Sequence, residues 1–460
     1  MKRLIPLLLA SVALLAWAGP AAAHGRGGDA DARFAQTIAG MEITVVVRAS
    51  VRVPAPLQVD VVAHDPGRGG RVDLTIRSAE GGGSSAGSVR IEPGRAGMYP
   101  ALLSVDRVGP HELEVRAGEE RSLLPLAVLV PRAPLWEVVM YAAFACAAVA
   151  LVGALAGALW FGRAVAGGFA GGFVVATVVA FTVGVLSPWF APAAPDGMPP
   201  APPQEVTPGR PNAQPVVEVA PERPVRGSEF VLRLALFDGS SGHPVDDLAE
   251  HHAALSHVVV TSEDGSYFRH VHPIRPAPGV YEVRLGAQAH GRHRVYAEFE
   301  RTGAGGQLVT GAFTVGDDGR PGDPSDPSDP SDAAGPAPVA AGPGGNALVT
   351  EPARPVAGRP VRLTLDTGHA DLQPWLGMAG HLIVRSRDGG YLGHVHESRS
   401  MATDARNVPD ESVTGYGPRL EFAFSFPRPG RYLAWTQYAR NYEIVTVPHV
   451  IDVAAEGHPR

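Results

Sequence analysis

The chain has 460 residues, enough for about three domains at roughly 150 residues each. Its formal net charge is -7 and it contains no basic block, which argues against a nucleic-acid partner. Lysine and cysteine each occur once, at Lys2 and Cys146, so an intrachain disulfide, a thiolate zinc site and lysine-based catalysis are excluded. Histidine, with 17 copies, is the residue type that remains for metal chemistry.

Residues 1–23 have the pattern of a secretory signal peptide. Lys2 and Arg3 precede a short apolar run, Leu4 to Trp17, and three alanines ending at Ala23 fit a cleavage site. An uncleaved membrane anchor is the alternative. Either form predicts export of the segment that follows.

Residues 34–131 contain many short runs in which apolar and polar residues alternate, with Pro/Gly clusters between them. Alternation of period two, broken by turn signals about every ten residues, predicts a β-sandwich of about seven strands.

Two apolar stretches, 135–160 and 164–190, come next and are separated by only a few residues. Neither carries a charge beyond Glu137, and each is long enough to cross a bilayer. They predict a transmembrane helical hairpin. After a cleaved signal peptide, the first span enters the cytoplasm and the second returns, so both soluble regions are expected on the extracytoplasmic side.

A Pro/Ala-rich linker at 191–214 and a low-complexity linker at 317–345 delimit two further modules, 215–316 and 346–455. The modules are related, because HVVVTSEDGSYFRHVH (257–272) aligns without gaps with HLIVRSRDGGYLGHVH (381–396) at nine of sixteen positions. Each is expected to be an immunoglobulin-like sandwich. The predicted fold is therefore mainly β, with three immunoglobulin-like β-sandwich modules and a two-helix transmembrane hairpin.

Asp264-Gly265 and Asp388-Gly389 are typical two-residue hairpin turns between alternating strands. Counting outward from the first turn places His257 opposite His272, with His270 on the same face of the ribbon. The second turn likewise brings three histidines together. Directly opposed side chains have Cβ atoms about 4.5–5.5 Å apart, which suits shared coordination of an ion.

The sequence therefore predicts a metal site in each module. His252, in the segment before the first ribbon, is a further candidate ligand. Imidazole ligands without thiolate favour copper, with zinc second. The competing interpretation is that these histidines are structural, and whether their face points into the sandwich or outward stays open. The full set of candidate metal ligands is His252, His257, His270, His272, His381, His394 and His396.

No catalytic constellation stands out, and a copper enzyme is the least favoured hypothesis. The sequence contains no nucleophile elbow, no His-Glu-x-x-His motif and no Gly-rich phosphate loop.

Residues 247–273, with the motifs HVVV and HVHP, resemble a bacterial group of exported β-sandwich proteins described as YtkA-like or FixH-like, or as periplasmic heavy-metal-binding proteins. Residues 377–396, with HLIV and HVH, are similar to the tandem partner in that group, and the N-terminal module is YtkA-like in pattern more than in motif. The second module departs by lacking a histidine equivalent to His252 and by having Glu397 in place of Pro273, so unequal affinities are expected.

The resemblance implies a membrane-associated extracytoplasmic protein that handles copper or another metal. The sequence leaves two hypotheses for the function. One is metal buffering, delivery or resistance, with an envelope metal transporter or oxidase as the expected partner. The other is a non-enzymatic envelope scaffold or assembly protein whose histidines are structural.

Overall fold

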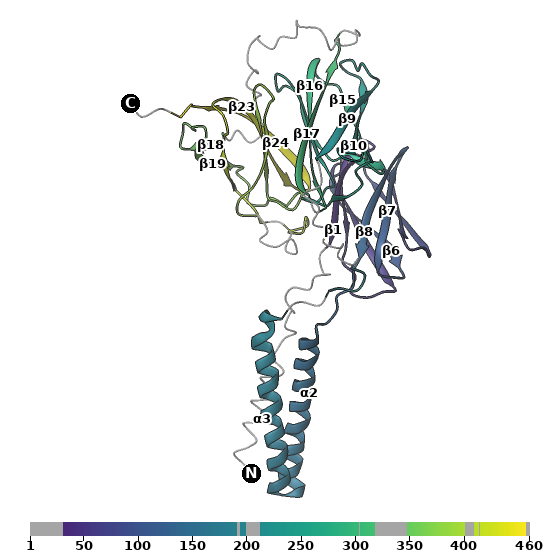
Figure 1. Cartoon of the computed structure of the whole chain (residues 1–460), viewed down its shortest axis with the longest axis vertical. Coiled ribbons are helices and arrows are strands. Elements are labelled where there is room, and N and C mark those ends of the chain that lie inside the picture. The colour runs from purple at the N-terminus through teal and green to yellow at the C-terminus, as the bar shows by residue number, and fades with distance from the viewer. Residues whose placement is uncertain are drawn as a thin grey trace. The chain divides into compact units, whose positions relative to one another are not determined.

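The computed structural model describes residues 31–190, 194–198, 212–302, 304–317, 347–400, 409–413 and 415–456. The described residues are mainly β and form two compact units, a helical hairpin within 129–198 and a β-sandwich unit built from the rest (Figure 1). The expected signal peptide at 1–23 lies outside the described residues, as does most of the linkers expected at 191–214 and 317–345.

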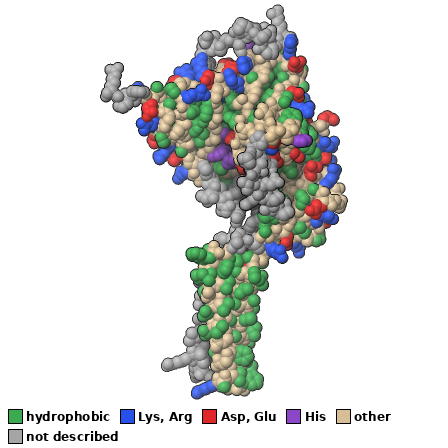
Figure 2. All heavy atoms as spheres, viewed as in Figure 1, with side chains coloured by type: hydrophobic (Ala, Val, Ile, Leu, Met, Phe, Trp, Pro, Cys, Tyr) green, Lys and Arg blue, Asp and Glu red, His purple; other side chains and the backbone are tan. Residues whose placement is uncertain are grey.

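The helical unit consists of α2 (Leu135–Ala156), which continues as the π-helical stretch η1 (Gly157–Phe161), and α3 (Arg163–Leu186), which ends in the 3₁₀ turn η2 (Ser187–Trp189). Each arm is 27 residues long and apolar enough to cross a membrane. Its visible surface consists mostly of hydrophobic side chains, with backbone and other uncharged groups between them (Figure 2). This composition fits a hairpin surrounded by lipid.

Two glycines let the helices approach closely. A Cβ at Gly153 would lie 2.4 Å from the Phe169 ring, and a Cβ at Gly157 would lie 2.8 Å from the backbone nitrogen of Ala166. A larger residue at either position would therefore push the helices apart.

The N-terminal module has eight strands rather than the expected seven or so. They form the sheets β1-β2-β3-β6 and β5-β4-β7-β8. The strands are β1 (Ala32–Ile38), β2 (Met41–Val47), β3 (Ala55–Asp65), β4 (Gly70–Ser78), β5 (Ser84–Ile91), β6 (Gly97–Val105), β7 (Gly109–Ala117) and β8 (Glu120–Val128).

The first repeat contains the sheet β14-β15-β10-β9 and a five-stranded sheet, β11-β16-β12-β13 with β17 paired to β16. Its apolar core is continuous with that of the N-terminal module. The strands are β9 (Ala213–Ala220), β10 (Glu229–Asp238), β11 (Leu248–Ala249), β12 (His257–Ser262), β13 (Phe268–Val271), β14 (Ile274–Ala277), β15 (Val280–Gly286), β16 (Gly291–Arg301) and β17 (Gly305–Val315).

The second repeat contains the sheets β18-β19-β22 and β21-β20-β23-β24, around an apolar core of its own. The strands are β18 (Val349–Glu351), β19 (Pro360–Asp366), β20 (His381–Ser386), β21 (Leu392–His396), β22 (Arg419–Ser425), β23 (Gly430–Arg440) and β24 (Glu443–Val453).

The strand register expected from the sequence is confirmed in both repeats. In β20 and β21, His381 is paired with His396, and in β12 and β13, Val259 is paired with His270. The expected two-residue turns are wrong, however. Each loop has four residues, because the closing hydrogen bonds run from Ser262 N to Tyr267 O and from Ser386 N to Tyr391 O.

A tight two-residue turn of this kind needs positive φ at both central residues, but in each loop only the glycine adopts it, at Gly265 (φ 77°) and Gly389 (φ 68°). The aspartate before it instead accepts hydrogen bonds within the loop, as Asp264 does from the backbone of Ser266. The longer loop keeps the same centre, so the pairing of the strands is unchanged.

Strands β12 and β20 are buried along their whole length because each has a core on both faces. Val258 and Val260 point into the core of the first repeat, whereas Val259 packs against Ile383 and Trp435 of the second repeat. His257 is two residues from Val259 and so shares its face. The histidine face therefore points at the other repeat.

Candidate metal centre

Six histidines, three from each repeat, converge where the two sheets meet. In the first repeat the ring centroids of His257, His270 and His272 are 4.9–5.5 Å apart. In the second repeat those of His381, His394 and His396 are 4.8–5.3 Å apart. The rings thus lie together on one face of each ribbon, as the sequence predicts.

The two triads lie against each other across the boundary between the repeats, a closeness that the expectation of one site in each module did not include. The His394 ring lies 5.2 Å from that of His270 and 5.3 Å from that of His257. The nitrogens of His257, His270 and His394 form one group that could hold a metal ion, and those of His381, His394 and His396 form another. One group therefore crosses the boundary between the repeats.

Two equivalent carbonyl groups fix one histidine in each repeat. His257 Nε2 lies 3.0 Å from the carbonyl oxygen of His251, and His381 Nε2 lies 2.9 Å from that of Trp375. A carbonyl oxygen only accepts, so each Nε2 donates its proton and each Nδ1 retains a lone pair. The two segments bend alike, with positive φ at His252 and at Leu376.

Three more histidines are held by side chains from a different module. His270 Nδ1 lies 2.9 Å from Gln437 Oε1, and His394 Nδ1 lies 3.0 Å from Glu298 Oε2. Each of these partners belongs to the other repeat and stands at an equivalent register position, Glu298 paired with His257 and Gln437 with His381.

The N-terminal module holds the third. His272 Nδ1 lies 2.5 Å from Glu42 Oε1 on β2, and Glu42 is itself bonded to Thr37. Each of these oxygens accepts a hydrogen bond from the Nδ1–H group, so in the neutral ring Nε2 of His270, His272 and His394 carries a lone pair.

The inner nitrogens of these five neutral rings therefore face one another as acceptors, because each ring carries its proton on the outer nitrogen. His257 Nδ1 is 3.3 Å from His270 Nε2 and 3.2 Å from His272 Nε2, and His381 Nδ1 is 3.1 Å from His394 Nε2. Two acceptors at this distance repel each other unless a cation lies between them. A tetrahedral ion with metal–nitrogen bonds of 2.0–2.1 Å separates its ligands by about 3.3 Å.

Burial favours the neutral form of five of these imidazoles, those of His257, His270, His381, His394 and His396. It is the largest influence on their pKa values, and neighbouring imidazoles lower them further. The pKa of His270 falls to about 3 and that of His396 to about 4, and those of His257, His381 and His394 lie well below the usual value. Neutral imidazole is the form that binds a metal ion.

His252 lies elsewhere than the sequence suggested. Its ring contacts that of His396 in the second repeat, with centroids 3.9 Å apart, and is 6.5 Å from that of His257. Nδ1 of neighbouring His251 lies 3.1 Å from Glu300 Oε2, and the His251 side chain is one-third exposed. His396 Nε2 is buried and has no hydrogen-bond partner among the residues that the structure describes. This corner connects the buried centre with solvent.

The outer partners Glu42, Glu298 and Gln437 were missed in the sequence. A usable signal existed for two of them, because the segments holding Glu298 and Gln437 align in the duplication. Glu42 lies 230 positions from His272, in an unrelated module, and nothing local marks it.

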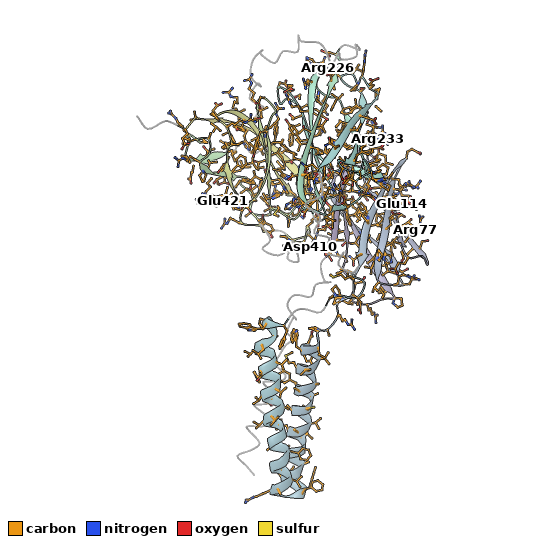
Figure 3. The ribbon with its side chains drawn as sticks, viewed as in Figure 1. Arg77, Glu114, Arg226, Arg233, Asp410 and Glu421 are labelled. Atoms are coloured by element: carbon orange, nitrogen blue, oxygen red, sulfur yellow. The ribbon has the colours of Figure 1, made fainter. Side chains whose placement is uncertain are left out.

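A second polar junction ties the N-terminal module to the second repeat without forming a metal group. Buried His64 lies 3.3 Å from Glu411 and 2.8 Å from the carbonyl oxygen of Tyr442. Nearby Asp410, labelled in Figure 3, forms an ion pair with Arg48. Burial disfavours the charged form of His64, but Glu411 outweighs it and raises the pKa.

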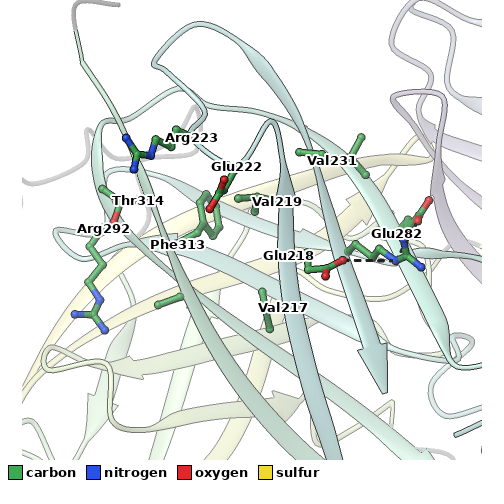
Figure 4. Close-up of a pocket in the computed structure, with 13 residues that line it drawn as sticks. Val217, Glu218, Val219, Glu222, Arg223, Val231, Glu282, Arg292, Phe313 and Thr314 are labelled. Carbon is green, nitrogen blue, oxygen red and sulfur yellow. Dashed lines mark ion pairs between the residues drawn. The ribbon is translucent and has the colours of Figure 1, made fainter. Parts of the chain in front are cut away.

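A surface groove on the first repeat shares no residue with the histidine centre. It has a volume of about 770 Å³ and lies between β9, β10 and the end of β17. Its charged side chains include Glu218, Glu222, Arg223 and Arg292, and the dashed line in Figure 4 marks the ion pair of Glu218 with Arg233. Paired charges of this kind are usual on an exposed sheet.

One family model, described as "Domain of unknown function (DUF8832)", matches the chain twice, at residues 216–318 and 345–455. No curated protein matches it. Among solved structures, red sea bream transglutaminase is 12% identical with a TM-score of 0.16; the match covers 53% of this chain and 31% of that one. A two-domain fibronectin type III segment of chicken tenascin is 10% identical with a TM-score of 0.16, over 52% and 99% of the two chains.

Proposed function

We propose that this protein binds a transition metal, with copper favoured over zinc, at the histidine centre between its repeats, and that it buffers or delivers the metal at the extracytoplasmic side of a membrane. The proposal rests on one observation: in these imidazoles one ring nitrogen is hydrogen-bonded to an oxygen and the other is left for a metal ion. Five of the six inner histidines have the outer nitrogen hydrogen-bonded and the inner one aimed at its neighbours.

Metal-binding histidines in proteins have this arrangement, in which a carboxylate or carbonyl oxygen fixes the tautomer and orients the ring. A structural histidine has no need of it, because a buried imidazole gains most when both nitrogens have partners. Imidazole ligands without a thiolate suit copper and zinc.

The cellular side of the proposal rests on the hairpin and on the resemblance noted above. The two 27-residue apolar arms would hold the β-sandwich unit at a membrane. An exported protein of this kind would meet metal ions outside the cytoplasm, where a transporter or oxidase could receive them.

The test is metal titration of the full-length protein in detergent after chelator treatment, followed by calorimetry and by metal analysis of the desalted protein. Wild type is expected to bind Cu(II) or Zn(II) at neutral pH. The double variants His270→Ala/His272→Ala and His394→Ala/His396→Ala should each lose bound metal.

The matched control is His243→Ala/His290→Ala, which removes two histidines outside the centre and should bind as wild type does. If wild type binds neither ion, the scaffold function is the one that remains. In that case the double variants would lower only the melting temperature.

A further inference from the structure

The six histidines are too many for one ion. A structural or catalytic site usually uses three or four protein ligands. One ion held by His257, His270 and His394 would leave His272, His381 and His396 unused in the interior. Lone pairs buried without a donor or cation carry a desolvation cost.

His394 is the residue that decides between one site and two. It belongs to both groups of nitrogens that could hold a metal. Its Nδ1 is bonded to Glu298, so only Nε2 is free and it can bind only one ion. If His394 binds with the second triad, the first group needs another ligand, and His272 Nε2 is already 3.2 Å from His257 Nδ1.

We infer that the centre is binuclear, with one ion held by His257, His270 and His272 and a second held by His381, His394 and His396. This inference rests on the proposed function. It uses every inner histidine once, and the two ligand sets stand at equivalent positions of ribbons that pair in the same register. The second set is already grouped closely enough for an ion, whereas in the first set His270 and His272 have to bring their nitrogens closer together around His257 Nδ1.

The two ions must lie close together. The ligand atoms of His257, His270 and His394 are all within 4.8 Å of one another, although the first two belong to one triad and the third to the other. With metal–nitrogen bonds of 2.0–2.1 Å, ions bound to His270 and His394 are at most about 9 Å apart. Two Cu(II) ions at such a distance have interacting electron spins.

In each triad one histidine is also oriented by a side chain of the other repeat. Gln437 of the second repeat orients His270 for the first ion, and Glu298 of the first repeat orients His394 for the second. Binding of one ion tightens this frame and pre-orders ligands of the other, so the second ion is expected to bind no more weakly than the first.

The experiment loads full-length apo-protein with one and then two equivalents of Cu(II), measures retained metal per chain, and records the EPR spectrum at each step. Two ions per chain are expected, with broadened signals and a half-field transition at full loading. Each of the double variants His270→Ala/His272→Ala and His394→Ala/His396→Ala should retain about one ion with a simple, uncoupled spectrum.

The wild-type measurements do not depend on whether a variant folds. One retained ion per chain, or two ions without spin interaction, would overturn the binuclear centre and leave the proposed metal binding intact. Retention of no ion would overturn both.

Discussion

Glu298 and Gln437 occupy equivalent positions in the two repeats, yet they offer His394 and His270 different acceptors. A carboxylate withdraws the imidazole proton more strongly than an amide oxygen does, which makes the opposite nitrogen a better donor to a metal. The Glu298–His394 pair should therefore strengthen metal binding by the second triad.

The variant Glu298→Gln tests this without changing the shape of the side chain. We expect it to weaken binding of the ion held by His394 about 10-fold, since loss of such a partner typically costs 10–100-fold in affinity. Competition with a chromophoric chelator measures the change. Glu282→Gln, which removes a carboxylate that pairs with Arg233, is the control and should have no effect. Equal affinities in wild type and Glu298→Gln would show that the contact is only structural.

At the scale of residues, the sequence was sufficient to predict that the inner histidines lie together, but not which residues hydrogen-bond to them. His257 and His272 could be paired because a hairpin fixes its own register by counting. Gln437 reaches His270 only through the docking of two sheets, and Glu42 only through a third module, so neither contact follows from any local pattern.

At the scale of elements, strands β12 and β20 belong to the stretch that aligns without gaps between the two repeats. Their alternation indicated which side chains share a face, and that part of the prediction is confirmed. Which face meets the other repeat could not be predicted, because both faces of each strand are apolar enough to be buried. Only the packing of Val259 against Ile383 and Trp435 decides it.

Arg385 joins these two strands by a buried charge, and no carboxylate in the described part of the chain forms an ion pair with it. It donates hydrogen bonds to Thr261 Oγ1 at 3.1 Å, to Ser262 O at 2.7 Å and to Glu263 O at 2.6 Å, all in the first repeat. Burial lowers its pKa. It is therefore a polar clamp at the end of the interface away from the histidines.

Replacing Arg385 by Met keeps most of the volume but leaves these oxygens without their donor. We expect the free energy of unfolding to fall by about 3 kcal/mol, because charged hydrogen bonds are lost and their acceptors stay buried without a donor. Urea denaturation of the full chain measures it. Arg362→Met, at an exposed arginine of the same repeat, should change stability by less than about 0.5 kcal/mol. A similarly small change for Arg385→Met would mean that the sheets are held by apolar contacts alone.

At the scale of the whole molecule, the buried imidazoles make the metal-free protein sensitive to acid. The pKa of His270 is lowered to about 3 and that of His396 to about 4, whereas the same groups titrate near 6.5 in an unfolded chain. Below pH 6.5 the unfolded state therefore binds protons that the folded state does not. Stability is highest above that pH and falls as the pH drops toward 4.

His64 acts in the opposite direction, because its folded pKa is raised and it is stabilising at low pH, but it is one group against several. The urea midpoint of the apo-protein should decrease as the pH is lowered from 7.5 to 5. The free energy of unfolding should decrease by more than the 1.4 kcal/mol per pH unit that one histidine can give. Saturating Zn(II) should raise the midpoint at pH 7.5, because the ion binds only the folded state. A midpoint that is flat or rises on acidification would contradict the buried, neutral centre.

The exchange of outer partners between the repeats also restricts how this chain can change over time. A duplicated domain usually leaves each copy free to diverge, to be lost or to move to another protein. Here neither copy can leave without taking away the residue that aligns a ligand of its sibling. Selection on the metal centre would therefore act on the two repeats as one inherited unit.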